Sequence, residues 1–290
     1  MAARTKQTSE SWETSENVLF LTVILLVTVI AYAPLVGGVW ELGSHTTQAL
    51  NAFALLLVAC VDSLLSVLKT DPFKPTINPH GLLLFGLSCF ALAVSSFTLV
   101  WPFAVLGLCL NAGALLSFCF GRRGAVAFYP ALAGFGVMVA MLVMVPRVDG
   151  LLRVLAGSVS SWMLPILGIR SDMIIQQEPF QVILVVEKGA RVFNVATECN
   201  GFGILISSLM LSLILSLRRR IPWYMTILVV ALSALSGLAF NVIRIVMIAL
   251  CSLKTDFPYA VIHEGMGTLV YLFAMAAICA LNLMVAKRRS

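Results

Sequence analysis

The sequence predicts an all-α polytopic membrane protein, with about eight transmembrane helices and a small extracytoplasmic amphipathic helix and β-hairpin. The first reason is composition: of 290 residues, 60% are hydrophobic and only 11% are charged, whereas a soluble domain carries about 25% charged residues. The second is that apolar runs of about 20 residues, enough for a helix to cross ~30 Å of hydrocarbon, recur along the whole chain. These runs do not alternate as barrel strands do.

The apolar runs predict the elements in order. A polar tail, residues 1–17, lacks the apolar core and cleavage site of a signal peptide, so we expect it in the cytoplasm, with the first span as an uncleaved anchor. Residues 18–146 hold spans one to five, residues 147–198 an extracytoplasmic segment, and residues 199–290 spans six to eight. The predicted spans are Val18–Trp40, Ala49–Leu68, Gly81–Val100, Pro102–Phe120, Ala125–Val145, Asn200–Leu217, Pro222–Cys251 and Glu264–Ala286.

The basic residues orient these spans. The net charge of +6 comes from short basic clusters between apolar runs, which is the pattern of a topology signal and not of a nucleic-acid surface. Cytoplasmic loops carry an excess of Lys and Arg. With the N-terminus inside, twelve of the 19 basic residues fall on the cytoplasmic side: Arg4, Lys6, Lys69, Lys74, Arg122, Arg123, Arg218, Arg219, Arg220, Lys287, Arg288 and Arg289. Lys254 lies in the one short outer loop that disagrees.

The segment 147–198 is predicted to contain two small elements. From Leu151, apolar residues recur at helical intervals and include Trp162, which is typical of an amphipathic helix at the membrane interface. The runs Phe180–Val186 and Arg191–Ala196 are rich in β-branched residues and are separated by a short stretch containing Gly189, so they predict a β-hairpin. This hairpin leads directly to Cys199.

Three polar residues are expected at one depth near the outer face. Cys199 lies where span six begins. Span seven enters from the inner side, and Arg244 lies 22 residues beyond Pro222, which is about 33 Å, or one bilayer core, at 1.5 Å per residue. His263 immediately precedes span eight, which also begins outside.

A Cys, an Arg and a His together suit thiol chemistry on a carbonyl group. The thiolate is the nucleophile, and both an Arg and a helix N-terminus favour it. Arg244 could also stabilise a negative oxygen, and His263 could carry a proton to the leaving amine. Glu198 opposes this by raising the pKa of the neighbouring thiol, unless it instead orients Arg244 or His263.

Structural alternatives exist for each residue, and His263 could simply belong to a loop. A Cys in a membrane helix is usually a small apolar filler, and Cys199 could instead form a disulfide with Cys251, which also lies near the outer face. Arg244 could be a snorkelling residue at a helix end, although an intramembrane Arg costs at least ~2.5 kcal/mol and is usually paired or functional. Asp62 is expected to face the bundle interior or the inner boundary in a structural role.

Three runs carry a family resemblance: ATECNGFGILISSLML, FNVIRIVMIAL and PYAVIHEGMGTLVYLF. Together, in this order, they resemble the exosortase/archaeosortase family of eight-span membrane proteins, over roughly residues 180–285. An Asn-x-x-Arg-Ile element of that family is present at Asn241 and Arg244. The family's Cys is commonly followed by Ser-Gly, whereas here Asn200 follows Cys199, which leaves the subtype and its cognate signal open.

The resemblance implies a sortase-like enzyme of the plasma (inner) membrane. Cys199 would be the nucleophile, Arg244 would stabilise the thiolate or oxyanion, and His263 would be the general acid and base. Its partners would be exported, membrane-anchored proteins whose C-terminal sorting signals (PEP-CTERM-like) are cut at the outer face through a thioester. Asn200 and Asn241 are our own candidates for additional hydrogen-bond donors.

No metal or other cofactor is implied. The sequence has no HExxH motif and no glycine-rich phosphate loop, and its three histidines are His45, His80 and His263. Two other functions are alternatives. A transporter or channel should show solute flux in proteoliposomes that survives Cys199→Ser. A non-catalytic scaffold with a Cys199–Cys251 bridge should show that bridge in non-reducing mass analysis.

Overall fold

The computed structural model describes most of the chain, in two compact units. The described residues are 17–32, ten helical positions between 54 and 69, 73, 75–98, 101–177, 180–186, 191–194 and 201–287. The described residues before Ala140 form one unit and those from Ala140 onward form the other. We describe each unit by itself.

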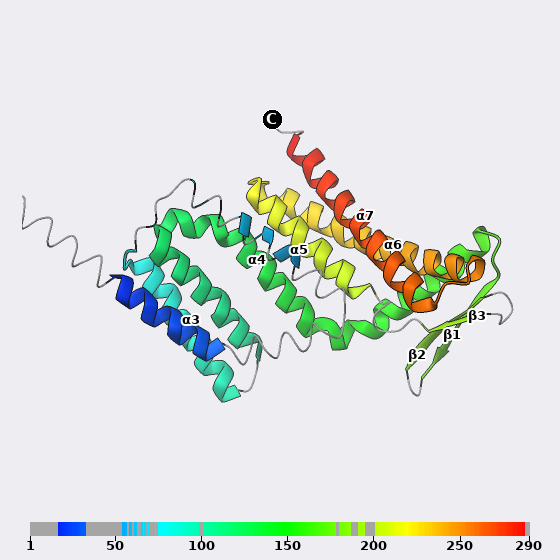
Figure 1. Ribbon diagram of the computed structural model, residues 1–290, viewed down its shortest axis with the longest axis horizontal. Coiled ribbons are helices and arrows are strands. Elements are labelled where there is room, and N and C mark those ends of the chain that lie inside the picture. The colour runs from blue at the N-terminus through cyan, green and yellow to red at the C-terminus, as the bar shows by residue number, and fades with distance from the viewer. Residues whose placement is uncertain are drawn as a thin grey trace, which may run out of the picture. The chain divides into compact units, whose positions relative to one another are not determined.

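The first unit is helical. It contains the helix Asn17–Tyr32, α3 (Pro79–Thr98) and the first part of α4 (Trp101–Ile166) (Figure 1). Asn78 caps α3, because its Oδ1 accepts a hydrogen bond from the backbone N–H of Gly81 at 2.8 Å. Helix α4 is interrupted at Gly121, whose φ of 66° and ψ of −174° are not helical. This interruption falls where the sequence predicts the boundary between spans four and five.

Neutral polar pairs join the helices of this unit. The Tyr32 and Ser88 hydroxyls lie 3.0 Å apart, and Thr28 donates to Asn111 Oδ1 at 3.1 Å. The ring of Phe118 is fully buried and meets Phe20 edge to face, with 5.7 Å between ring centroids. Small hydroxyl and amide pairs therefore hold together helices whose remaining surface is apolar.

The second unit begins with the C-terminal part of α4 and a small antiparallel sheet. Strands β1 (Ser171–Gln176), β2 (Gln181–Val186) and β3 (Arg191–Asn194) are ordered β1-β2-β3. Alternate residues of β2 point inward, and those inward side chains are fully buried. They form one apolar core with α4 and α6, made of Ala156, Leu164, Ile169, Val182, Leu184, Val186, Val242, Ile245, Val246 and Ala249.

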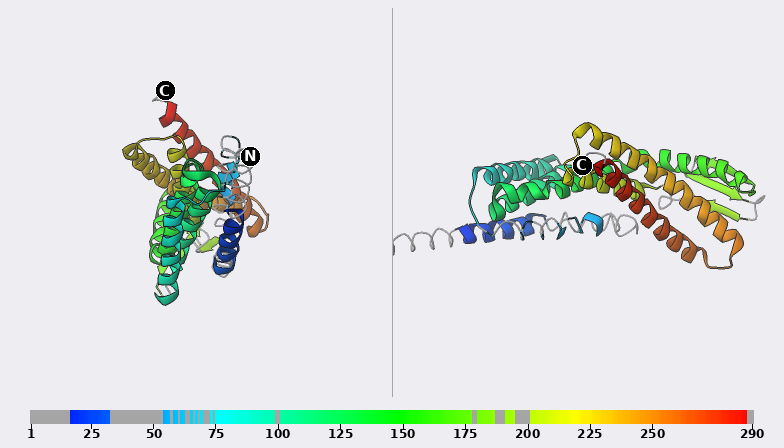
Figure 2. Two further views of the ribbon diagram at one scale, coloured as in Figure 1. Left: turned by 90° about the vertical axis from the view of Figure 1, so that its left-hand side faces the viewer. Right: turned by 90° about the horizontal axis from the view of Figure 1, so that it is seen from above.

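Three long helices complete the second unit. They are α5 (Phe202–Arg218), α6 (Trp223–Lys254) and α7 (Tyr259–Lys287), and each packs against the other two (Figure 2). Two hydrogen bonds tie α5 to α7: Tyr271 donates to Ser207 at 3.1 Å, and Ser216 donates to Asn282 at 3.1 Å. These bonds set the position of α7 along α5 and its rotation about its own axis.

The predicted spans compare with these helices as follows. Among the described residues, Pro79–Phe97, Trp223–Lys254 and Tyr259–Lys287 are long and apolar enough to cross a membrane. They correspond to predicted spans three, seven and eight. Shorter apolar helices correspond to spans one, four, five and six. The second span falls on residues described only in part, so the total of eight stays a prediction.

Two details differ from the predicted arrangement. The amphipathic segment from Leu151 is not a separate helix, because α4 runs on through it to Ile166. Pro146 lies inside α4 without ending it, which apolar bundles tolerate where neighbouring groups compensate for the missing N–H. The predicted hairpin is confirmed as β2 and β3, but the sheet has a further strand, β1, that the sequence did not predict.

Candidate active site

Unusual residues come together from the C-terminal half of α6, the N-terminal part of α7 and the start of α5. Gly201 immediately precedes α5, Asn241 and Arg244 lie on α6, and His263 lies in the second turn of α7. Cys199, Glu198 and Asn200, which the sequence singles out, lie outside the described residues. The described groups of the site are therefore those around Gly201, Asn241, Arg244 and His263.

Arg244 and His263 are direct neighbours. Arg244 is only 3% exposed, and its Nη2 lies 3.2 Å from Nε2 of His263. A guanidinium has no acceptor atom, so Arg244 is the donor and Nε2 of His263 accepts. This arrangement requires the neutral imidazole with its proton on Nδ1. Two residues expected to meet on the basis of depth alone thus touch across the α6–α7 contact.

The helix that carries His263 begins earlier than the sequence predicts. The apolar run suggested a span from Glu264 with His263 just before it, but α7 begins at Tyr259, directly after Pro258. His263 is therefore held on a helix and not on a loop. One turn earlier, the Tyr259 ring lies near the imidazole, with 5.7 Å between ring centroids, and Tyr259 is about half exposed.

Gly267 allows Arg244 to lie against α7. It is one turn beyond His263 and so shares its helix face. A Cβ at Gly267 would lie 3.1 Å from Nε and 3.2 Å from Nη2 of Arg244, closer than such atoms normally approach. The guanidinium thus lies against the α7 backbone through Nε and Nη2, and Nη2 also contacts the imidazole. Gly267 was not singled out from the sequence, although its spacing of four residues from His263 places both on one face of a helix.

Gly201 brings the start of α5 against α6. Its φ of +80° is in the left-handed region, which favours glycine. A Cβ there would lie only 2.4 Å from Cγ of Asn241, so two independent constraints require a glycine. Asn241 is 1% exposed and lies one helical turn before Arg244. Consecutive turns of α6 therefore approach Gly201 through Asn241 and the His263 face of α7 through Arg244.

The burial of Arg244 demands such contacts. Arginine in the apolar layer costs at least ~2.5 kcal/mol, and the imidazole of His263 supplies a hydrogen-bond acceptor for Nη2 of Arg244. The opposite side of α6 is fixed as well, because Val242, Ile245 and Val246 belong to the core shared with β2 and α4. The guanidinium is consequently held in position from both sides of its helix.

The other singled-out residues are placed as follows. Cys251 is a free cysteine and is partly buried on α6, which gives no support to a Cys199–Cys251 disulfide. Asp62 is exposed in the structure, so its side chain does not face a bundle interior. Within the described parts of the chain, no group of three or more His, Cys, Asp or Glu side chains is arranged to hold a metal ion.

Comparison with known protein families shows which proteins this chain resembles. The family model described as transmembrane exosortase (Exosortase_EpsH) matches residues 40–280, well over half of the chain. The matched region includes all of α5 and α6 and most of α7. No curated protein and no solved structure matches the chain significantly.

Proposed function

Since the chain belongs to the transmembrane exosortase family, and hence has a membrane transpeptidase role in general terms, we propose that Cys199, Arg244 and His263 form its active site. The enzyme cuts the C-terminal sorting signals, PEP-CTERM-like in type, of exported proteins. It works at the outer face of the plasma membrane, where the orientation predicted from Lys and Arg puts this end of α6. Its partners are the lipid bilayer and membrane-anchored clients.

The observation that carries this proposal is the 3.2 Å contact between Arg244 Nη2 and His263 Nε2. A buried guanidinium paired with an imidazole at a helix end suits chemistry on a carbonyl group. The contact between Asn241 and Gly201 adds to it. Cys199 is two residues from Gly201, so covalent geometry limits their Cα atoms to at most about 7 Å apart. This short connection to Gly201 supports assigning the nucleophile to a site shared with Asn241 and Arg244.

The proposed first half-reaction is acyl transfer to sulfur. As the client binds, the Arg244 N–H moves from Nε2 of His263 toward the scissile carbonyl oxygen, which frees the one lone pair of Nε2. The thiol proton of Cys199 then passes to Nε2, and the sulfur attacks the scissile carbonyl. The negative oxygen of the tetrahedral intermediate is stabilised by Arg244, with the amides of Asn241 and Asn200 as candidate additional donors. The C–N bond then breaks, the proton on His263 goes to the leaving amine, and a thioester remains on Cys199.

The second half-reaction releases the client. An acceptor amine, hydroxyl or water attacks the thioester while His263 takes its proton, and the Cys199 thiolate leaves and is reprotonated. Glu198 is kept as a supporting residue that orients His263 or Arg244. Neither step calls for a metal or an organic cofactor.

The test compares two thiols of the same protein. A secreted reporter domain is fused to a motif containing Pro-Glu-Pro, an apolar helix and an arginine-rich tail, and its release is followed in cells. Cys199→Ala should abolish release while leaving the protein inserted in the membrane, because the nucleophile is gone. Cys251→Ala, the matched control at a free thiol on α6, should release the reporter normally. Full release in the Cys199→Ala variant would refute the proposal.

A further inference from the structure

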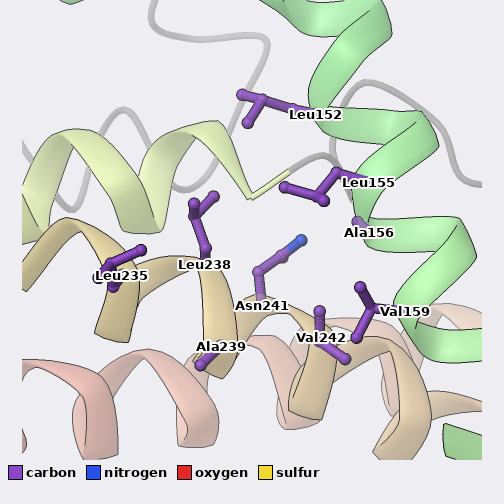
Figure 3. Close-up of a pocket in the computed structure, with 9 residues that line it drawn as sticks. All are labelled: Leu152, Leu155, Ala156, Val159, Leu235, Leu238, Ala239, Asn241 and Val242. Atoms are coloured by element: carbon purple, nitrogen blue, oxygen red, sulfur yellow. The ribbon is translucent and has the colours of Figure 1, made fainter.

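A groove lies between the C-terminal part of α4 and the middle of α6. It has a volume of about 240 Å³ and is lined by Leu152, Leu155, Ala156 and Val159 of α4 and by Leu235, Leu238, Ala239, Asn241 and Val242 of α6. Figure 3 shows apolar side chains of both helices around this space, with the amide of Asn241 directed away from α6 into it. Among the nine lining residues, Asn241 is the polar one.

The groove begins at the candidate active site. Asn241 forms its wall and also contacts Gly201, two residues after Cys199. From Asn241 the groove follows α6 back toward Leu235, six residues or about 9 Å along the helix axis. In the predicted orientation this direction leads from the outer face into the hydrocarbon, because α6 runs from the inner to the outer side.

The space is open to the surroundings and is not a sealed void. Leu155 is 44% exposed and Leu235 is 63% exposed, one on each side of the groove. Because eight of its nine lining residues are apolar, the groove offers water few hydrogen-bond partners and favours an apolar occupant. An apolar cavity of ~150 Å³ holds a benzene molecule, so this groove has room for one aromatic or two aliphatic side chains.

We propose that the groove is the subsite for the first apolar side chains of the client's membrane anchor, immediately beyond the scissile bond. This inference rests on the proposed function, in which the anchor is the leaving group. The anchor must pass from a carbonyl held near Gly201 into the lipid, and the groove offers that starting point, that direction and an apolar lining. Asn241, at the mouth, is positioned to hydrogen-bond the client backbone where it leaves the reaction centre.

The test is a size-matching experiment on the same reporter, with Ala, Phe or Trp as the first anchor residue. The wild type should process the Phe client roughly tenfold better than the Ala client, since filling an apolar subsite is worth about that factor. Ala156→Leu fills the groove from α4 and should bring the Phe-to-Ala ratio of processing rates to about one. Leu155→Ala widens the rim and should raise processing of the Trp client.

Matched controls lie on the same helix outside the groove. Ala140→Leu and Leu151→Ala alter exposed positions and should leave all three ratios at wild-type values. Because Leu155 is at the rim and partly exposed, its variant keeps the test informative even where Ala156→Leu folds poorly. Ratios that stay at wild-type values in both groove variants, with release still dependent on Cys199, overturn the subsite and leave the proposed function standing.

A second readout does not need cleavage. A photo-reactive phenylalanine at the first anchor residue of the client is cross-linked in the Cys199→Ala variant, and the adduct is mapped by mass spectrometry. Adducts within Leu152–Val159 or Leu235–Val242 support the subsite, even if release proves independent of Cys199 and the proposed function fails. Adducts found only with lipid or with other helices overturn it, because the first anchor residue then lies outside the groove.

Discussion

The two units of the molecule use buried polar residues differently. Among the described residues before Ala140, the buried polar side chains are all neutral, and several of them join helices in pairs such as Tyr32–Ser88 and Thr28–Asn111. The second unit has such pairs too, but it also buries the guanidinium of Arg244 against His263. Neutral pairs suffice to hold apolar helices together. A buried ionisable pair costs more than a neutral one, which is why we propose a functional role for this pair.

The largest expected difference is between substitution of Arg244 and substitution of a neutral buried polar residue. Arg244→Ala should lower reporter release by about 10²–10³-fold, the usual loss when an oxyanion-stabilising group is removed. Asn111→Ala, at a buried polar position of the first unit, should lower the melting temperature in detergent but leave release per folded molecule unchanged. If both variants instead lose release only in proportion to the loss of folded protein, the two kinds of buried polar residue do not differ in function.

A second pair compares two left-handed glycines. Gly201 and Gly121 both have a φ between +60° and +85°. A Cβ at Gly121 meets nothing within 4 Å, but one at Gly201 collides with Asn241. Gly121→Ala should therefore cost only about 1–2 kcal/mol of backbone strain. Gly201→Ala should add a displacement of the segment that holds Cys199, and should reduce release about 100-fold.

Release rates and melting temperatures of both variants provide the measurement. Equal rates per folded molecule would mean that the contact between Gly201 and Asn241 does not position the thiol.

A third pair compares two close approaches to a helix backbone. A Cβ at Gly267 would press on the Arg244 guanidinium at 3.1 Å, and one at Gly81 would press on the Phe118 ring at 2.5 Å. Gly267→Ala should shift the guanidinium by a few tenths of an ångström and reduce release about tenfold, by extension from the ~100-fold cost of a 1 Å misplacement. Gly81→Ala should lower only the melting temperature. A release rate for Gly267→Ala equal to the wild type would show that Arg244 has room to move without loss.

The smallest effects concern the tyrosine hydrogen bonds. Tyr271→Phe and Tyr32→Phe each remove one buried hydroxyl contact, to Ser207 and Ser88 respectively. Such bonds in apolar bundles are worth about 0.6 kcal/mol on average. Both variants should therefore melt slightly earlier and release the reporter at the wild-type rate. A selective loss of release in Tyr271→Phe would extend the functional region down α7, beyond the Arg244–His263 pair.

The sequence predicted the membrane class, the apolar helices and the β2–β3 hairpin because each follows from a local pattern. It missed β1, whose residues are mostly exposed and whose alternation is weak. It placed the start of α7 five residues late, because hydropathy reports where the chain becomes apolar and not where helical hydrogen bonds begin. The latter is set here by Pro258, whose carbonyl accepts from the amides of Val261 and Ile262.

For the site, the sequence predicted how deep each residue lies in the membrane but not which way its side chain faces. Counting residues along span seven put Arg244 level with His263, but only the packing of α6 on α7 determines that the two side chains face each other. The close approaches at Gly201 and Gly267 depend on the same packing and could not be read from spacing alone. Cys199, Glu198 and Asn200 remain predictions from the sequence and the family.

The apolar core shared by β2, α4 and α6 has a mechanical consequence. Three of its four α6 members, Val242, Ile245 and Val246, lie within two residues of Arg244. Six residues connect the last residue of β3, Asn194, to Gly201. The sheet and the candidate active site are thus joined twice, once through the packed helix α6 and once through these six residues. Such doubly linked parts tend to open as one cooperative unit, so loosening the sheet should expose the buried guanidinium at the same time.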